Sequence, residues 1–484
     1  MKVYKAAYAA IATAAVASPC WALDVSQVLA QPLNQPQAVE PSALEYESYY
    51  GGASPADEMP EPTPLYSEPA AVAPAHSAVP VSEAPCEPVA EAAPVACAPV
   101  EPAPTRCCCP APASCCNLGE AFTLSEYLLG PCRTWDFGMW TQIGYHSQQT
   151  PLSNNFADGL AFNDVPNQLN LHQQWFWFEK VADGSAGLDW GFRFDIMYGT
   201  DAQKTQAFGN DNAVWDAGQG FDYGEYGWAM PQAYLELATG DWSVLMGHFY
   251  TLVGYEVVTA PDNFFYSHAY TMFNSEPFTH TGVIGTYSGY ENFEVYTGWT
   301  AGWDTGFDQY TQNGTAGSNF LGGFSANLTD NVAFTYICTF GDFGQRSDGA
   351  TYDNAGARDT SAYSHSMVFD VAVSDQLNYV FQSDLVSVGN GVGHDQVGIN
   401  QYLFYTLNDC WAVGSRLEWW RNDSQDFHEI TFGLNYRPHA NVVFRPEVRY
   451  DWTPRDGGFG ESPDGSGRFR DEEATFGIDM VLTY

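Results

Sequence analysis

The stretch HEITFGLNYRPHANVVFRPEVRYDW, from His428 to Trp452, holds two segments whose side chains alternate in type with a period of two. In the second segment the apolar Val442, Phe444, Val448, Tyr450 and Trp452 alternate with the charged Arg445, Glu447, Arg449 and Asp451. Successive strand residues point to opposite faces, so each segment predicts a strand with one apolar and one polar face. The tight turn at His439-Ala440 makes the two an antiparallel hairpin. Such strands suit a barrel wall between lipid and water, and also a soluble sandwich.

The lengths of the connections separate these two folds. Similar alternation predicts sixteen strands, at residues 135–146, 169–181, 187–200, 231–239, 241–250, 281–288, 291–302, 318–328, 331–342, 364–374, 376–389, 394–408, 410–422, 427–437, 441–453 and 472–484. Tight turns join every second pair, and longer Gly-, Asp- and Asn-rich segments lie between them. Outer-membrane barrels are built this way, whereas Greek-key sandwiches have no reason to alternate loop length. The chain from 133 to 484 is therefore predicted to be an all-β transmembrane antiparallel barrel of sixteen strands, with both termini periplasmic.

The last predicted strand ends the printed sequence on an aromatic residue. In TFGIDMVLTY, Phe476, Ile478 and Met480 share one face and Tyr484 stands last. This pattern resembles the C-terminal aromatic signal that barrel-assembly machinery recognises. We therefore expect that machinery to be a partner, acting through Tyr484.

The first 22 residues resemble a secretory signal peptide. Lys2 and Lys5 precede a short apolar run, and Cys20-Trp21-Ala22 fits a small-x-small cleavage site. The mature chain is then expected to enter an oxidising compartment, where cysteines tend to pair. Together with the predicted barrel, this indicates an outer-membrane location.

Residues 23–116 lack usable periodicity and contain 18 of the 29 prolines, mixed with Ala, Glu and Val. Such a segment has too little apolar content to offset its chain entropy, so we expect a disordered periplasmic extension. Residues 117–132 form a junction. There, Thr123-Leu124-Ser125-Glu126 fits a capping box before a short helix that Gly130-Pro131 should end.

Eight cysteines lie in or near the junction, an even number that favours a disulfide framework without giving its connectivity. They are Cys86, Cys97, Cys107, Cys108, Cys109, Cys115, Cys116 and Cys132. The bonds could form within one chain or between chains, and metal binding is the less favoured alternative in an oxidising compartment.

Composition excludes several classes of function. The chain has 58 acidic and 17 basic residues, which disfavours a nucleic-acid partner because phosphate binding needs clustered Lys and Arg. No phosphate-binding glycine loop, His-Glu-x-x-His zinc motif or nucleophile elbow occurs in the sequence. We therefore expect no enzyme activity, no metal site and no cofactor.

Several segments carry a family resemblance. They are GHFYTLVGYEVV from Gly247 to Val258, Asn263-Phe264-Phe265-Tyr266-Ser267, EPFTHTGV from Glu276 to Val283, and Trp140-Thr141-Gln142-Ile143-Gly144-Tyr145. They resemble the OmpL-like β-barrel porin family over roughly residues 133–484. The resemblance implies an outer-membrane porin and leaves the extension unexplained.

The segment between the fifth and sixth predicted strands, residues 251–280, could fold into the lumen and narrow it, as in sixteen-stranded general porins, or remain an exposed external loop. It carries Glu256, Asp262 and Glu276, while alternation points Arg416, Arg445 and Arg449 inward from the wall. Loop acids facing wall arginines across the lumen would create a transverse field at a pore constriction.

The aromatic residues admit two interpretations. Pairs such as Trp175 with Trp177 and Trp419 with Trp420 favour interfacial girdles, which any membrane barrel carries. Trp420 shares a face with Arg416 and Glu418, so it is the best candidate for an aromatic side chain in the lumen.

The function that fits best is a passive pore for small hydrophilic solutes or ions, with outer-membrane lipid around it and a homo-oligomer, such as a trimer, as its assembly. Its acidic lumen face predicts a modest cation preference. The alternative is a structural or adhesive coat protein that is cross-linked through its cysteine-rich extension.

Overall fold

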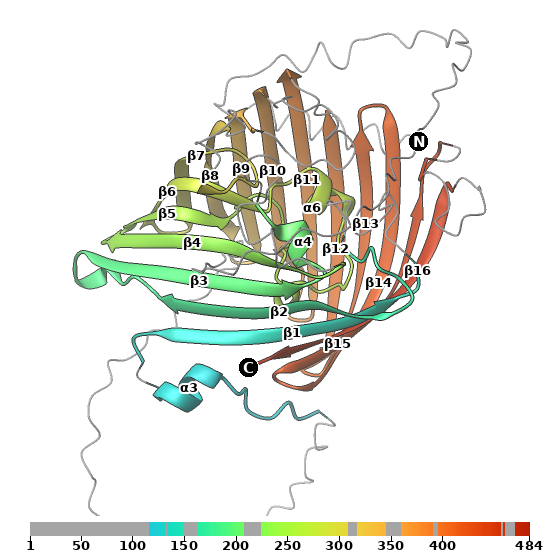
Figure 1. Cartoon of the computed structure of the whole chain (residues 1–484), viewed down its shortest axis with the longest axis horizontal. Coiled ribbons are helices and arrows are strands. Elements are labelled where there is room, and N and C mark those ends of the chain that lie inside the picture. The colour runs from blue at the N-terminus through green and yellow to red at the C-terminus, as the bar shows by residue number, and fades with distance from the viewer. Residues whose placement is uncertain are drawn as a thin grey trace, which may run out of the picture. The chain divides into compact units, whose positions relative to one another are not determined.

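The computed structural model describes residues 116–131, 133–148, 162–207, 224–307, 317–344, 360–390, 395–455, 458–459 and 470–484. Sixteen strands close into one antiparallel barrel, in which each strand pairs with its sequence neighbours and β1 pairs with β16 (Figure 1). The strands are β1 Asp136–His146, β2 Leu169–Lys180, β3 Asp189–Gly199, β4 Gly227–Thr239, β5 Trp242–Tyr250, β6 Thr279–Tyr290, β7 Phe293–Thr300, β8 Ser318–Thr329, β9 Val332–Asp342, β10 Thr360–Ala372, β11 Leu377–Asn390, β12 Gln396–Asn408, β13 Trp411–Asn422, β14 Gln425–His439, β15 Val442–Trp452 and β16 Glu472–Thr483. The predicted fold class and strand number are confirmed. No helix among the described residues is both long and apolar enough to cross a membrane.

The connections follow the predicted alternation with two clear departures. Residues 181–188, which include the 3-10 turn Gly184–Ala186, join β2 to β3 where a tight turn was expected. Short turns close β4–β5, β6–β7, β8–β9, β10–β11, β12–β13 and β14–β15. At the opposite end, residues 423 and 424 alone join β13 to β14, where a longer loop was expected. Asp423 adopts a positive φ of 51° there, a conformation that two-residue hairpin turns require.

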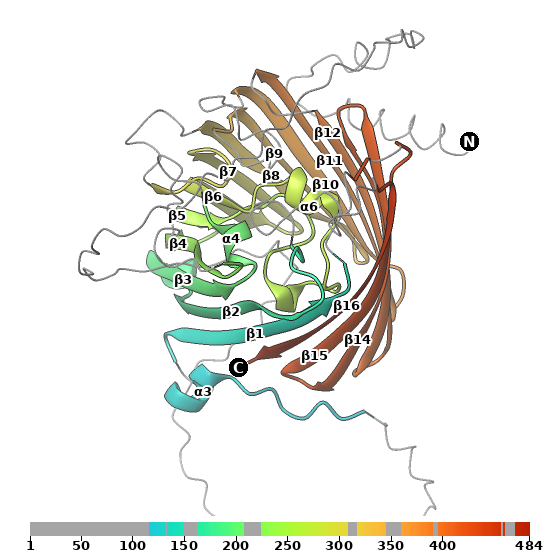
Figure 2. The ribbon, with the colours of Figure 1, turned by 45° about the vertical axis from the view of Figure 1, so that its right-hand side comes forward.

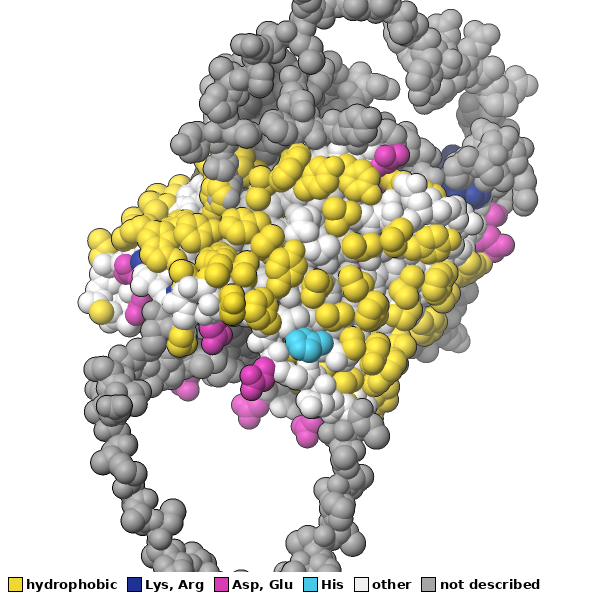
Figure 3. Space-filling view, turned by 60° about the horizontal axis from the view of Figure 1, so that its bottom comes forward, with side chains coloured by type: hydrophobic (Ala, Val, Ile, Leu, Met, Phe, Trp, Pro, Cys, Tyr) yellow, Lys and Arg dark blue, Asp and Glu magenta, His cyan; other side chains and the backbone are white. Residues whose placement is uncertain are grey.

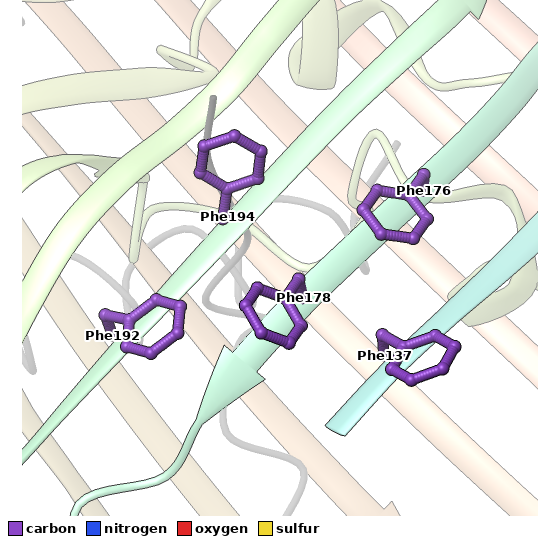
Figure 4. A pocket seen from close by; sticks show the side chains of 5 residues that line it. All are labelled: Phe137, Phe176, Phe178, Phe192 and Phe194. Atoms are coloured by element: carbon purple, nitrogen blue, oxygen red, sulfur yellow. The ribbon is translucent and has the colours of Figure 1, made fainter. Parts of the chain in front are cut away.

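The outward face of the barrel is apolar. In Figure 3, hydrophobic side chains cover most of the visible wall, while Asp and Glu lie near its margin. On β1, β2 and β3, five phenylalanines line an entirely apolar hollow of about 550 Å³ (Figure 4): Phe137, Phe176, Phe178, Phe192 and Phe194. A wall of this kind matches the lipid-facing band of a membrane barrel.

Trp175 and Trp177 lie on the other side of the wall, so the girdle interpretation is wrong for both. Trp175 is fully buried, donates a hydrogen bond from Nε1 to Asp195 at 2.6 Å and stacks on Trp140. Trp177 packs against the same buried cluster, under the Arg193 guanidinium. Trp420 faces inward as predicted and is 1% exposed.

The junction before the barrel forms a strap along its short-turn end. Helix α3, Leu124–Leu129, begins after Thr123 and ends at Gly130, although the Thr123 side chain makes no capping hydrogen bond to the helix backbone. Asn441, in the β14–β15 turn, accepts a hydrogen bond from the Phe122 backbone N–H at 2.7 Å and donates one to its carbonyl at 2.7 Å. The strap therefore docks on the barrel itself.

A disulfide holds the start of this strap. Cys116 bonds to Cys410 in the β12–β13 turn, a cysteine absent from the predicted group of eight. The two residues are 294 positions apart in the sequence, so no local spacing indicates the pair. Cys86, Cys97, Cys107, Cys108, Cys109, Cys115 and Cys132 lie outside the described residues.

Peptide mapping of the oxidised protein is expected to yield one cross-linked species that joins the peptides of Cys116 and Cys410, because the bond lies within one chain. Reduction or Cys410→Ser should remove that species. Cys338→Ser, on β9, is the matched control and should leave it intact. A Cys116 linkage found only in covalent dimers would contradict the intrachain bond and favour cross-linking between chains.

Candidate functional site

Residues 251–278, which connect β5 to β6 and are called the inner loop below, lie inside the barrel. Figures 1 and 2 show this segment crossing the interior, with helix α6, Tyr270–Asn274, among the strands. A 3-10 turn, η2, spans Ala260–Asp262. Tyr270, Thr271 and Phe265 are at most 3% exposed. The sequence left two positions open for this segment, and the structure shows the one inside the barrel rather than an exposed external loop.

Arg416 on β13 is the central contact between the inner loop and the wall. Its Nη1 donates to Glu256 Oε1 at 2.8 Å and to the Ser267 carbonyl at 2.7 Å, while its Nε donates to Glu429 Oε1 at 2.5 Å. Arg416 and Glu429 are both 0% exposed. One guanidinium therefore joins a wall carboxylate to both a side chain and the backbone of the loop.

Two further arginines bind the loop through its backbone. Arg445 on β15 forms an ion pair with Asp479 and donates from Nη1 to the carbonyls of Ala260 and Asn263 at 2.8 and 2.7 Å. Arg449 pairs with Asp451 and donates to the His268 carbonyl at 2.5 Å. These bonds give loop carbonyls hydrogen-bond partners on the wall.

Wall carboxylates satisfy the backbone N–H groups of the same loop. Glu447 accepts from Tyr266 N at 2.9 Å and Ser267 N at 3.1 Å. Glu418 accepts from Tyr270 N at 2.6 Å and Thr271 N at 2.7 Å. The alternating Arg and Glu residues of β13 and β15 thus form hydrogen bonds to both the backbone N–H groups and the backbone carbonyls of the loop.

Inward glycines on the wall make room for the aromatic rings of the loop. A Cβ on Gly414 would lie 2.5 Å from the Phe264 ring, and one on Gly433 would lie 2.9 Å from the Phe265 ring. A Cβ on Gly144 would lie 2.6 Å from the Tyr266 hydroxyl. Because each distance is shorter than real Cβ contacts, larger residues at these positions would displace the loop.

The carboxyl groups of the loop differ in their electrostatics. Burial raises the pKa of Glu256, but Arg416, together with His268 and the Ala269 N–H, outweighs burial and lowers that pKa to about 2. Burial, and then the charge of Asp384, raise the pKa of Glu276 well above its usual range. Glu256 is therefore an ionised anchor, while Glu276 favours its neutral form.

Of the six residues proposed for a constriction, only Asp262 is exposed. It accepts a hydrogen bond from Thr259 Oγ1 at 2.6 Å. The other five are at most 8% exposed: Glu256, Glu276, Arg416, Arg445 and Arg449. Sequence reasoning placed the loop acids and wall arginines across the lumen from each other, whereas Glu256 and Arg416 are in direct contact. The Glu256–Arg416 pair therefore attaches the inner loop to the wall.

Sequence reasoning missed the glycines, and it missed Glu418 and Glu447 as acceptors of backbone N–H groups. Alternation had already placed both glutamates inward. The pattern Asn263-Phe264-Phe265-Tyr266-Ser267 was recognised only as a family resemblance. This pattern does contain a usable signal. Three successive aromatic residues in an otherwise polar loop require space on the facing wall, which small residues such as glycine provide.

A comparison with known protein families agrees with this architecture. Residues 135–484 match the family model described as "Putative beta-barrel porin-2, OmpL-like". No curated protein sequence matches the chain.

Solved structures that resemble the chain are distant in sequence. An anion-selective porin from Comamonas acidovorans has 12% identity and a TM-score of 0.48, over 72% of this chain and 99% of that one. The outer-membrane channel DcaP of Acinetobacter baumannii has 10% identity and a TM-score of 0.45, over 72% and 97%. A mutant of the Rh. blastica porin has 12% identity and a TM-score of 0.44, over 72% and 100%.

The family match covers the whole barrel, including the inner loop and the wall that holds it. This chain belongs to the OmpL-like family of β-barrel porins of the outer membrane.

Proposed function

We propose that the barrel is a passive pore for small hydrophilic solutes or ions and that the inner loop is its fixed constriction. The observation that carries this proposal is the attachment of the loop to the inner wall by Arg416, Arg445 and Arg449. If the loop left the wall, its buried backbone groups would lose their hydrogen-bond partners. The loop therefore stays attached and narrows the lumen permanently. Solutes would then cross the barrel by diffusion, without a catalytic step.

Open-channel conductance of the purified protein in a planar bilayer tests this function. A pore should give stepwise ion currents, whereas a coat protein whose barrel only anchors the extension should give none. Repeated insertion into the bilayer without current would therefore overturn the pore.

Ion selectivity is expected to depend on Asp262, because it is the one exposed carboxylate among the six constriction residues. A carboxylate in a narrow aqueous passage attracts cations. Asp262→Asn should lower the cation-to-anion permeability ratio, as measured by reversal potential in a salt gradient. The effect should shrink as salt rises, since exposed charges are screened beyond about 10 Å at 0.1 M.

Asp330→Asn removes the same charge from the exposed β8–β9 turn and serves as the matched control. It should change the permeability ratio much less. Equal effects of the two substitutions would show that Asp262 does not line the constriction.

We further propose that the N-terminal extension and both termini of the chain lie in the periplasm and that barrel-assembly machinery recognises Tyr484. Support comes from β1 and β16, which begin and end at the short-turn end, near α3 (Figure 1). The Tyr484 hydroxyl lies 3.1 Å from Thr141 Oγ1, which helps to close the β1–β16 seam. We also propose that the barrels assemble as a homo-oligomer, such as a trimer.

A further inference from the structure

Five aromatic rings from the inner loop and β12 meet inside the barrel. This lumen aromatic cluster consists of Tyr255, Phe264, Phe265, Tyr402 and Phe404. Ring centroids lie 4.9 Å apart for Tyr255 and Tyr402, and 4.8 Å apart for Phe264 and Phe404. Phe265 is 6.0 Å from Phe404, so the rings are continuous across loop and wall.

The cluster is only partly covered. Phe265 and Tyr402 are buried, while Tyr255, Phe264 and Phe404 keep part of their surface accessible. The passage of purely hydrophilic solutes does not require accessible aromatic surface at the constriction. Accessible aromatic rings can pack against a solute that has an apolar or cationic part.

A carboxylate lies next to this cluster. Asp370 on β10 is the cross-strand partner of Val380, which packs within the cluster. Val368, two residues before Asp370 on the same face, also packs there. Within the part of the chain that the structure describes, no residue forms an ion pair with Asp370 or donates a hydrogen bond to its carboxylate. Burial, and then the negative charge of Asp370, raise the pKa of Tyr255.

The three arginines that hold the inner loop are already engaged, including Arg416, whose guanidinium lies 5.2 Å from the centroid of the Phe265 ring. Arg416, Arg445 and Arg449 each bind at least one carboxylate and at least one loop carbonyl. The accessible rings therefore share their surroundings with the Asp370 carboxylate, whereas the arginine charges are neutralised by their own partners. Aromatic faces and a carboxylate together attract organic cations, whose charge is spread over apolar groups.

We propose that the lumen aromatic cluster and Asp370 form a binding site for small organic cations that carry an aromatic or alkyl group. The inference deepens the proposed pore function, on which it rests, by naming a class of solute. The ring of such a cation lies against Phe264 and Phe404, and its ammonium group lies near Asp370. A neutral or anionic solute of the same size loses the charge attraction.

Binding is tested with benzyltrimethylammonium on the full-length protein in detergent, by saturation-transfer NMR. This measurement does not require conduction. Benzyltrimethylammonium should bind more tightly than tetramethylammonium, which lacks the ring, and than benzoate, which has the opposite charge. Equal binding of benzyltrimethylammonium and benzoate would overturn the proposal.

Two substitutions probe the two parts of the site. Phe404→Leu removes one aromatic face and should weaken benzyltrimethylammonium binding by about twofold to thirtyfold. Asp370→Asn keeps the size of the side chain and should weaken both quaternary ammonium ions. Asp330→Asn, in the exposed turn, is the charge-matched control and should change neither. Unchanged binding in Asp370→Asn would contradict the site even if Phe404→Leu failed to fold.

Conductance separates the inference from the pore function. In the bilayer, benzyltrimethylammonium should reduce potassium current at a lower concentration than tetramethylammonium does. Current without such selective block would contradict the site and leave the pore standing. Selective binding by NMR without any current would support the site and reject the pore.

Discussion

Arg416→Met is expected to lower the free energy of unfolding by about 3–5 kcal/mol, because it removes the nearest cation from two buried carboxylates. Glu256 and Glu429 would both remain in the interior, and the pKa of Glu256 lies at about 2 only because Arg416 and its other partners overcome the cost of burial. Urea unfolding in detergent micelles measures the loss. Since Arg416 also binds the Ser267 carbonyl, the inner loop should loosen and single-channel conductance should become larger and noisier.

Arg421→Met is the matched control on the same strand. Arg421 pairs with Asp426 at 2.7 Å, but its side chain is 44% exposed, and exposed pairs contribute about 0–1 kcal/mol. Equal losses of unfolding free energy in the two variants would show that Arg416 contributes no more to stability than an exposed arginine does. A partial recovery in the triple variant Arg416→Met, Glu256→Gln and Glu429→Gln would identify the unpaired carboxylates as the cause.

Leu434→Arg is expected to cost about 2–4 kcal/mol if residue 434 lies near the bilayer midplane, because a guanidinium would replace an apolar group against lipid. Leu434 is inside β14, and its cross-strand partner, Val413, is an exposed apolar residue of the outward face. Unfolding in lipid vesicles measures the loss, and the folded protein should migrate differently on a gel before and after boiling.

Leu407→Arg makes the same chemical change one residue before the end of β12, beside the short turn. Leu407 is 48% exposed, and near the interface an arginine should cost about 0–1 kcal/mol. If Leu434→Arg were as mild as Leu407→Arg, the outward face of β14 would not lie in hydrocarbon.

The barrel itself could be predicted from the sequence, because strand alternation is a local property. Residues 442–452 show their two faces without any tertiary information, and the Arg445, Glu447 and Arg449 side chains do point inward. Alternation was less informative where both faces are apolar. Within LHQQWFWFEK on β2, Trp175 and Phe176 face opposite ways, and only the lumen packing shows which is inside.

What the sequence determined by itself is therefore the fold class, the strand number and the inward face of the charged residues on clearly alternating strands such as β15, since each depends on neighbours along the chain. Tertiary structure alone decided the role of the inner loop. The Arg416–Glu256 contact spans 160 residues and the Cys116–Cys410 bond spans 294, distances at which no periodicity carries information. The reason is closure of the barrel: it brings β13 and β15 to the loop, and the buried backbone of the loop then takes its partners from whichever wall residues lie within reach.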